Sequence, residues 1–247
     1  MHGFLGQSSM TISDFLIIPA TAAHLKYAEE ICEEMFESAK ARGTGIARRK
    51  PEYVIKKMEE GKAVIALHRD GRWAGFCYIE TWSHGDYVAN SGLIVNPEFR
   101  KVGLAKAIKK RIFELSREKY PKAKIFGLTT GLAVMKINSD LGYEPVTYSE
   151  LTPDEEFWKG CQSCINYDIL VSKERKNCMC TAMLWDPEEK EKELREKIQR
   201  KAEAKERLDR IAKKQSLLKR IEAKLWRSTK KIIAAVFPVG TRPAKGY

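Results

Sequence analysis

Two cations and a glycine, within the stretch Arg100–Ala105, join a short apolar run to an amphipathic helix. The apolar run Gly92–Val95 ends at Asn96-Pro97, as a buried strand does when proline removes a ladder donor. From Leu104 onward, apolar residues recur at three- and four-residue steps, which is typical of an amphipathic helix. The unpaired amides of a helix start, the positive end of its dipole and the two cations favour an anion, and a pyrophosphate fits. The alternative is an ordinary strand-to-helix turn without a ligand. The residues expected at this anion site and on the strand before it are Leu93, Ile94, Val95, Arg100, Lys101, Val102, Gly103, Leu104 and Ala105.

A second group of residues with chemical potential is a set of four cysteines. Cys161 and Cys164 are separated by two residues, and Cys178 and Cys180 by one, with thirteen residues between the pairs. Four thiolates from two short segments are what tetrahedral zinc requires. We therefore expect a structural zinc site, with core and loop thiols as the alternative.

Composition limits the class of protein. The 247 residues are 43% hydrophobic, without an apolar run near the length that crosses a bilayer and without a visible signal peptide. A cytoplasmic globular protein is expected, in which cysteines are thiols or metal ligands. The net charge of +12 is concentrated in Asp186–Lys231, which holds 17 basic and 10 acidic residues. The basic character therefore belongs mainly to the C-terminal segment.

The order of patterns along the chain predicts an α/β domain over residues 1–184. The expected strands and helices alternate, with Asp70-Gly71 as a hairpin turn and Gly142 as a helix end. A charged helix of about 40 residues with a narrow apolar stripe is expected within 185–231, followed by a tail at 232–247. The expected strands are 15–18, 62–68, 73–82, 92–95, 125–130, the segment beginning at 143, and a last strand before 184, and the expected helices are 21–36, 52–60, 104–115 and 132–141.

The motif Arg100-Lys101-Val102-Gly103-Leu104-Ala105, after a strand and Asn-Pro and opening a helix, resembles the acyl-CoA signature of the GNAT N-acyltransferase superfamily. The later Leu141-Gly142-Tyr143-Glu144-Pro145-Val146 resembles the element that ends the superfamily's second motif. The resemblance implies a GNAT fold, with a mixed central sheet of about seven strands flanked by helices. It also implies acetyl-CoA, or another acyl-CoA such as succinyl-CoA, as co-substrate.

Three further places resemble the acetyltransferase domain of N-acetylglutamate synthases: Gly45–Glu52, Leu128–Thr130, and Glu144–Pro153 with Arg175–Asn177. This resemblance implies acyl transfer to the α-amine of an amino acid, with L-glutamate as the expected acceptor, as in early arginine biosynthesis. Arginine grips carboxylates bidentately, which suits a dicarboxylic substrate. The implied substrate-binding residues are Arg48, Arg49, Thr129, Thr130, Arg175 and Asn177, of which Asn177 replaces the family's serine.

The catalytic groups are less well defined. A glutamate often carried by the family aligns with Ala89, and the tyrosine that serves many GNAT enzymes as general acid aligns with Asn138. The acceptor amine must lose a proton before it attacks the thioester, and the candidates to take it are Glu80, His84 and Asp86. His84-Gly85-Asp86 also fits a simple hairpin turn. A backbone amide of Leu93–Val95 is expected to meet the thioester oxyanion.

Two other functions remain open. A GNAT enzyme could acetylate protein or RNA amines, with the basic helix steering an acidic partner, although nucleic acid is disfavoured because the helix has few aromatic residues. A non-catalytic, zinc-braced module could instead assemble through the long helix. The expected partners are a small amino-acid substrate and, through residues 186–231, a second copy in a homodimer or larger oligomer, with no membrane.

Overall fold

The structure, a computed structural model, describes residues 10–41, 43 and 49–236, with only the backbone given at Ala234 and Ala235. The chain divides into two compact units, Met1–Lys190 and Glu191–Tyr247. The first unit contains the sheet. The second contains most of helix α7 (Pro187–Val236), which is 50 residues long. No helix among the described residues combines the length and apolarity needed to cross a bilayer.

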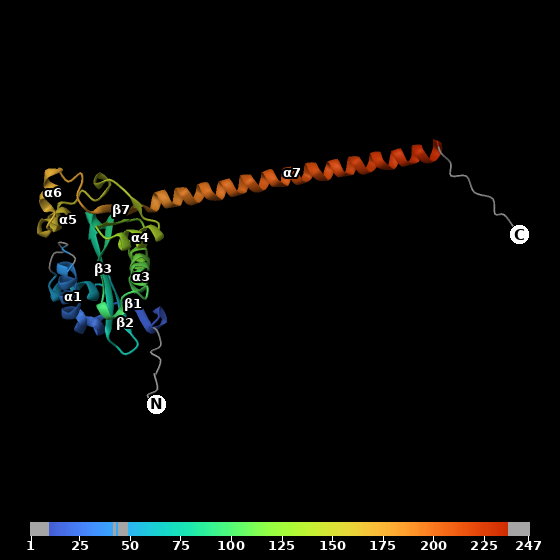
Figure 1. The fold of residues 1–247 in the computed structure, drawn as a ribbon. Coiled ribbons are helices and arrows are strands. Elements are labelled where there is room, and N and C mark those ends of the chain that lie inside the picture. Colours follow the sequence, from blue (N-terminus) through green and yellow to red (C-terminus); the bar gives the residue numbers. More distant parts are fainter. Residues whose placement is uncertain (1–9, 42, 44–48, 237–247) are drawn as a thin grey trace, which may run out of the picture. The chain divides into compact units, whose positions relative to one another are not determined.

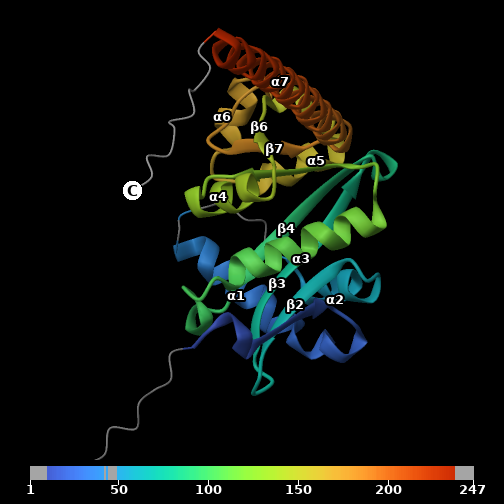
Figure 2. The ribbon, with the colours of Figure 1, turned by 90° about the vertical axis from the view of Figure 1, so that its right-hand side faces the viewer.

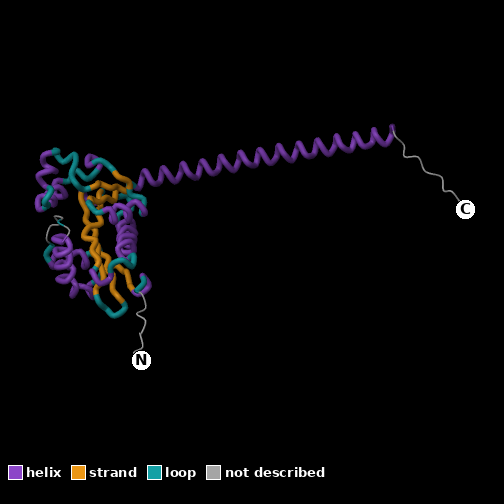
Figure 3. Tube along the Cα trace, in the orientation of Figure 1, coloured by secondary structure: helices purple, strands orange, loops and turns teal. Residues whose placement is uncertain are grey.

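The first unit is a mixed sheet with helices on both faces (Figures 1 and 3). The strands are β1 (Phe15–Pro19), β2 (Ala63–His68), β3 (Trp73–Trp82), β4 (Tyr87–Val95), β5 (Lys124–Thr129), β6 (Glu144–Pro145) and β7 (Thr181–Trp185). The helices are α1 (Ala28–Ala41), α2 (Pro51–Glu59), α3 (Leu104–Lys119), α4 (Leu132–Asp140), α5 (Glu155–Lys159) and α6 (Tyr167–Ser172), and a 3₁₀ helix (Ala22–Tyr27) precedes α1.

The seven strands are ordered β1-β2-β3-β4-β5-β7-β6. Every neighbouring pair is antiparallel except β4 and β5, which run parallel. Helix α3 connects these two strands, because parallel neighbours need a crossover. The predicted GNAT-type sheet with flanking helices is confirmed.

Three groups of buried side chains hold the layers together. Helix α3 places Ile108 and Ile112, one turn apart, on one face of the sheet, and Figure 2 shows α3 in front of β3 and β4. Helices α1 and α2 cover the other face at β2 and β3, through Ile31 and Val54 among others. A third cluster, including Trp158 and Leu170 of α5 and α6, packs against β5 and β7.

The two parallel strands separate soon after they meet. β4 pairs with β5 at only three positions, the last of which joins Ala89 to Phe126. β5 continues along β7 to Thr129, and β4 continues along β3 to Val95. Within the described part of the chain, the β5-facing edge of β4 therefore has no strand partner from Asn90 to Val95.

Several predicted boundaries were wrong. β4 begins at Tyr87, not Gly92, because the polar Asn90 and Ser91 in its middle hide the strand pattern. β6 has only two residues, and the helices α5 and α6 were not predicted. Helices α3 and α7 are longer than predicted, since their charged outer faces continue the helix beyond the apolar positions.

Candidate acyl-CoA and acceptor site

The predicted anion site is an open corner lined by backbone amides. None of the amides from Lys101 to Lys106 donates to a protein acceptor within the described residues. Lys101 has a φ of +70° and Gly103 one of +86°, so the chain turns sharply before α3 begins. A Cβ at Gly103 would meet no atom within 4 Å, so nothing fills the space in front of it. The corner can therefore accept a phosphate group at the positive end of α3.

Arg100 has a structural role at this corner. Its Nε donates to the carbonyl of Val95 at 3.1 Å, and its Nη2 donates to Glu34 Oε1 at 2.8 Å and to Ser38 Oγ at 2.9 Å. The guanidinium thus ties α1 to the end of β4. Lys101 is exposed and has no carboxylate partner among the described residues, which leaves it as the cation available to an anion.

A β-bulge lies in β4, where it faces the opening. Tyr78 pairs with Ser91 and Phe76 with Ile94, so two residues of β4, Gly92 and Leu93, oppose one of β3. Gly92 has a φ of +65°, and a Cβ there would lie 2.3 Å from Tyr78 Cε1. The residue added by the bulge is not paired in the ladder, so this part of β4 can present an amide to a carbonyl oxygen in the opening.

A group of polar side chains lies on the α2 side of β3. Glu80 accepts hydrogen bonds from the hydroxyl of Tyr53 and from Lys57 Nζ, the latter at 2.7 Å. The side chains of Lys57 and Glu80 are 12% and 13% exposed. The Tyr53 and Tyr78 rings pack edge to face at 5.9 Å. We call Arg49, Tyr53, Lys57, Tyr78 and Glu80 the α2 polar cluster.

Glu80 stands opposite the position where the family's glutamate is missing. It pairs with Ala89 across the β3–β4 ladder. Residues paired in this way place their side chains on the same face of the sheet, with Cβ atoms about 5 Å apart. A carboxylate is therefore present beside the start of the opening between β4 and β5, on β3 instead of β4.

Arg49 belongs to the α2 polar cluster. Its Nε donates to the hydroxyl of Tyr78 at 2.8 Å, and its guanidinium lies 5.7 Å from the centre of the Tyr53 ring. Burial raises the pKa of Tyr78 to about 12, opposed by the Arg49 charge, so the tyrosine is neutral at pH 7. The neighbouring Arg48 lies outside the described residues.

The other two candidate bases lie in a turn. Ser83–Gly85 forms a 3₁₀ turn between β3 and β4, with φ values of +49°, +58° and +97°. His84 and Asp86 are exposed there. The amide of Asp86 donates to the Ser83 carbonyl at 3.1 Å, as in a hairpin turn. Neither side chain is a member of the α2 polar cluster.

Asn138, at the position of the general acid, is 1% exposed. Its Nδ2 lies 3.7 Å from Met183 Sδ, and its Oδ1 has no hydrogen-bond partner among the described residues. An amide cannot give up a proton at neutral pH. The side chain is thus a poor proton donor for a leaving thiolate.

The remaining substrate candidates lie on other elements. Arg175, which has a φ of +60°, donates to both oxygens of Glu155 at 2.7 and 2.8 Å. Thr129 is the last residue of β5, and its Oγ1 accepts from the amide of Gly131 at 3.0 Å. Thr130 and Asn177 are exposed, and Asn177 Oδ1 accepts from the amide of Cys178. No contact joins these residues to the α2 polar cluster in the described part of the chain.

The four cysteines surround the cluster at α5 and α6. Cys164 Sγ accepts from the amide of Asn166 at 3.5 Å, and Cys178 Sγ donates to the carbonyl of Asn166 at 3.7 Å. Burial, together with smaller contributions from Cys178, Cys164 and Cys161, raises the pKa of Cys180 to about 11. All four are free thiols. Within the described ranges no three His, Cys, Asp or Glu side chains are arranged to hold a metal ion, so the zinc site stays a prediction.

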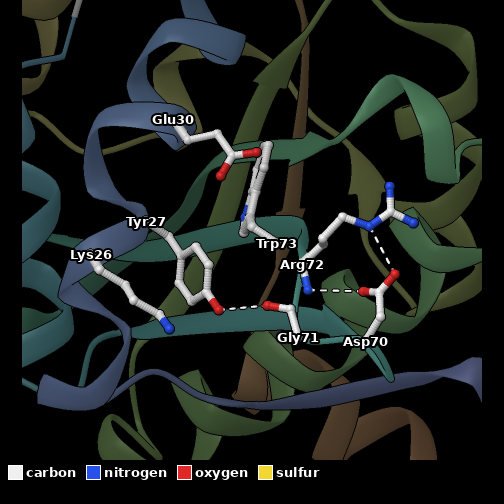
Figure 4. Close-up of a pocket in the computed structure, with 7 residues that line it drawn as sticks. All are labelled: Lys26, Tyr27, Glu30, Asp70, Gly71, Arg72 and Trp73. Atoms are coloured by element: carbon white, nitrogen blue, oxygen red, sulfur yellow. Dashed lines mark hydrogen bonds and ion pairs between the residues drawn. The ribbon is translucent and has the colours of Figure 1, made fainter.

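A cavity of about 430 Å³ lies at the β2–β3 turn (Figure 4). Tyr27 donates to the carbonyl of Gly71 at 2.6 Å at its edge. The cavity is lined by Lys26, Tyr27, Glu30, Asp70, Gly71, Arg72 and Trp73, none of which was a predicted site residue.

Comparison with known proteins supports the same fold. The model of the acetyltransferase (GNAT) family matches residues 29–133. N-acetylglutamate synthase from Neisseria gonorrhoeae, solved with coenzyme A and N-acetyl-glutamate, is similar over 70% of this chain at 16% identity and a TM-score of 0.50. This chain covers only 35% of that synthase.

Two other solved structures are similar at lower TM-scores. Rv2747 from Mycobacterium tuberculosis, in complex with CoA and NLQ, aligns over 69% of this chain and 98% of its own, at 17% identity and a TM-score of 0.49. The ribosomal-protein-S18-alanine N-acetyltransferase of Escherichia coli aligns over 70% of this chain and 93% of its own, at 11% identity and a TM-score of 0.44. No curated protein matches the sequence.

The family match spans α1 to the start of α4, which includes the amide-lined corner, the bulge in β4 and the opening between β4 and β5. This chain has the GNAT fold, and residues 29–133 match the model of the acetyltransferase (GNAT) family.

Proposed function

We propose that this chain transfers an acyl group from acyl-CoA to the α-amine of an amino acid, with L-glutamate as the first candidate and acetyl as the first candidate acyl group. The observation that carries the proposal is the corner of unpaired amides from Lys101 to Lys106, next to the open edge of β4. A CoA pyrophosphate bound there would direct the rest of the cofactor along that edge, toward the bulge at Gly92.

The acceptor would bind beside the α2 polar cluster. Arg49 and Lys57 bring two positive charges to this face, and Glu80 brings one negative charge. Arginine and lysine side chains form charge-assisted hydrogen bonds with carboxylates, so this face suits a carboxylate ligand. The synthase from Neisseria, solved with N-acetyl-glutamate, supports glutamate as the acceptor to test first, for a step early in arginine biosynthesis.

Glu80 is the proposed general base. Lys57 and the Tyr53 hydroxyl both donate to its carboxylate, and an ionised carboxylate has about four lone-pair positions, so it can accept a further proton. The amine transfers a proton to Glu80 and attacks the thioester carbon. The freed amide at the bulge binds the oxyanion, and the C–S bond breaks. The departing thiolate takes the second proton that the nitrogen loses, and Glu80 releases the first proton to solvent. The products are an N-acyl amino acid and CoA.

The test is a CoA-release assay with acetyl-CoA or succinyl-CoA and each of the twenty amino acids. Glutamate is expected to give the highest rate. Activity only with protein or RNA amines would refute the amino-acid acceptor. Absence of acetyl-CoA binding in isothermal titration calorimetry would refute the whole proposal and favour a non-catalytic assembly module.

Variants of the α2 polar cluster then test the assigned roles. Arg49→Ala is expected to raise KM for glutamate about 10- to 100-fold, as a lost charged hydrogen bond does. Tyr78→Phe, which removes only the hydroxyl that Arg49 contacts, is the matched control and should change KM much less. Glu80→Gln should lower kcat by about 10²- to 10⁴-fold with little change in KM, since it removes a base without changing shape. An unchanged kcat would exclude Glu80 as the base.

A further inference from the structure

Helix α7 has two halves of different charge. Residues 187–204 contain six basic and six acidic residues, whereas residues 205–236 contain eleven basic and three acidic residues, a net charge of +8. We call 205–236 the basic half. The composition of the two halves indicates that they do not have the same role.

The i, i+4 ion pairs of the helix end at Arg210, near the start of the basic half. Glu191–Arg195, Glu196–Arg200 and Glu206–Arg210 are pairs four residues apart, at 2.8, 3.3 and 2.6 Å, which stabilise a solvated helix. Beyond Arg210 no lysine or arginine pairs with a carboxylate in the described part of α7. The basic half therefore carries a row of cations without an anionic partner.

Apolar side chains form the other side of the basic half. At 100° per residue they occupy about half of the helix circumference, and most of the cations occupy the opposite half. Each of the apolar side chains is between 44% and 66% exposed. They are Leu208, Ile211, Leu217, Leu218, Ile221, Leu225, Trp226, Ile232, Ile233 and Val236, and the cations opposite them are Lys205, Lys213, Lys219, Arg220, Lys224, Arg227, Lys230 and Lys231.

We propose that the basic half binds the surface of an anionic lipid bilayer, with its axis in the plane of the interface. A wide apolar face enters the boundary between headgroups and acyl chains, and the cations opposite and beside it attract lipid phosphates. Trp226 lies on the apolar face with Lys230 Nζ 5.7 Å from its ring centre, a combination suited to an interface with one apolar and one polar side. The prediction of no membrane partner considered only a spanning segment.

A second copy of the helix or a nucleic acid fits these observations less well. Two copies of the basic half placed side by side would bring +8 against +8, with few carboxylates to offset the repulsion. A nucleic acid would use the cations but leave the apolar face in water. An anionic bilayer offers an apolar region to one side of the helix and lipid phosphates to the cations of the other side.

Four residues depart from the pattern. At 100° per residue, Arg207, Arg210 and Lys214 fall within the arc of the apolar side chains. Glu222 is the only acidic residue on the apolar side of the basic half, between Leu218 and Leu225. A carboxylate there opposes an anionic, apolar surface. Glu222→Gln should therefore strengthen binding severalfold.

The test is cosedimentation of the full chain with phosphatidylcholine vesicles, with and without one-third phosphatidylglycerol. Binding is expected only to the anionic vesicles, and 0.5 M salt should weaken it, because the attraction is electrostatic. The triple variant Lys219→Gln/Arg220→Gln/Lys224→Gln is expected to bind about a hundredfold more weakly, at about fivefold per cation. Its matched control, Arg195→Gln/Lys197→Gln/Arg200→Gln, loses the same charge in the neutral half and should bind like the wild type.

Two measurements distinguish a bilayer from a second copy of the chain or a nucleic acid as the partner of the basic half. Leu218→Ser/Leu225→Ser should abolish vesicle binding while far-ultraviolet circular dichroism confirms that the helix persists. Equal binding to neutral and anionic vesicles, or no binding to either, would overturn the proposal. So would sedimentation velocity showing a dimer that this double variant disperses, or a preference for nucleic acid over vesicles. None of these variants touches the proposed acyl-transfer site, so CoA release should stay unchanged.

Discussion

The lysine at position 109 allows a quantitative test of the packing beneath the sheet. Lys109 lies on the sheet-facing side of α3 and is 2% exposed, with Nζ 5.2 Å from the centre of the Tyr143 ring. Burial lowers the pKa of Lys109 to about 8, and the nearby Cys77 opposes this in part. A solvated lysine titrates near 10.5, and each pKa unit corresponds to about 1.4 kcal/mol. The buried charge therefore costs about 3 kcal/mol of folding free energy below pH 8.

The sign of the pH dependence follows from proton binding. Below pH 8 the lysine is protonated in both states, and the folded state carries the full cost of the buried charge. Between pH 8 and 10.5 the unfolded chain binds more protons than the folded chain, so this contribution makes the protein more stable as pH rises. Lys109→Met keeps the length of the side chain without the charge. At pH 7 the variant is expected to be more stable than the wild type by up to about 3 kcal/mol.

The assay is urea unfolding of wild type and Lys109→Met between pH 7 and 10.5, and the quantity of interest is the difference in unfolding free energy. This difference should shrink toward zero as pH rises through 8 to 10. Lys110→Met is the matched control, because Lys110 is exposed on the same helix, and it should give a pH-independent difference. A difference for Lys109→Met that stays constant from pH 7.5 to 10, or a destabilised variant at pH 7, would refute the reasoning.

Three further predictions concern other parts of the domain. Gly92→Ala should destabilise the domain by at least about 2 kcal/mol in urea unfolding, since its Cβ would lie 2.3 Å from the ring of Tyr78 and the φ of +65° disfavours alanine; a stability equal to wild type would show that the bulge can relax. Glu155→Gln should lower KM for glutamate severalfold and Arg175→Ala should raise it, because Glu155 occupies the guanidinium that the substrate would need; identical KM values in both variants would remove Arg175 from the substrate site. Elemental analysis is expected to find one zinc per chain, lost in Cys161→Ser, and metal-free wild type would refute the zinc prediction.

Local patterns predicted much of the fold correctly. The hairpin between β2 and β3 and the end of β4 at Asn96-Pro97 depend on residues next to each other, and both are confirmed. The spacing of apolar residues also located α3. These features are encoded within a few residues of where they occur, so a single sequence contains the information.

Identifying the residues of the site required information that a single sequence lacks. Glu80 was one candidate base among three, and its pairing with Ala89 and its contacts with Tyr53 and Lys57 distinguish it. The pairing of Glu80 with Ala89 depends on the register of the β3–β4 hairpin, which no local pattern specifies. Arg100 was assigned to the cofactor from its place in a motif, whereas its contacts with Glu34 and Ser38 come from a helix more than sixty positions earlier.

The short contact between β4 and β5 has a mechanical consequence. Three residue pairs join the half of the sheet made by β1 to β4 to the half made by β5, β7 and β6. A ligand bound in the opening between β4 and β5 would contact both strands and so connect the two halves of the sheet. At a concentration 100 times its dissociation constant, such a ligand raises the free energy of unfolding by about 2.7 kcal/mol. Acyl-CoA would then be a structural member of the sheet as well as a reactant, because it would bridge strands that only three residue pairs join.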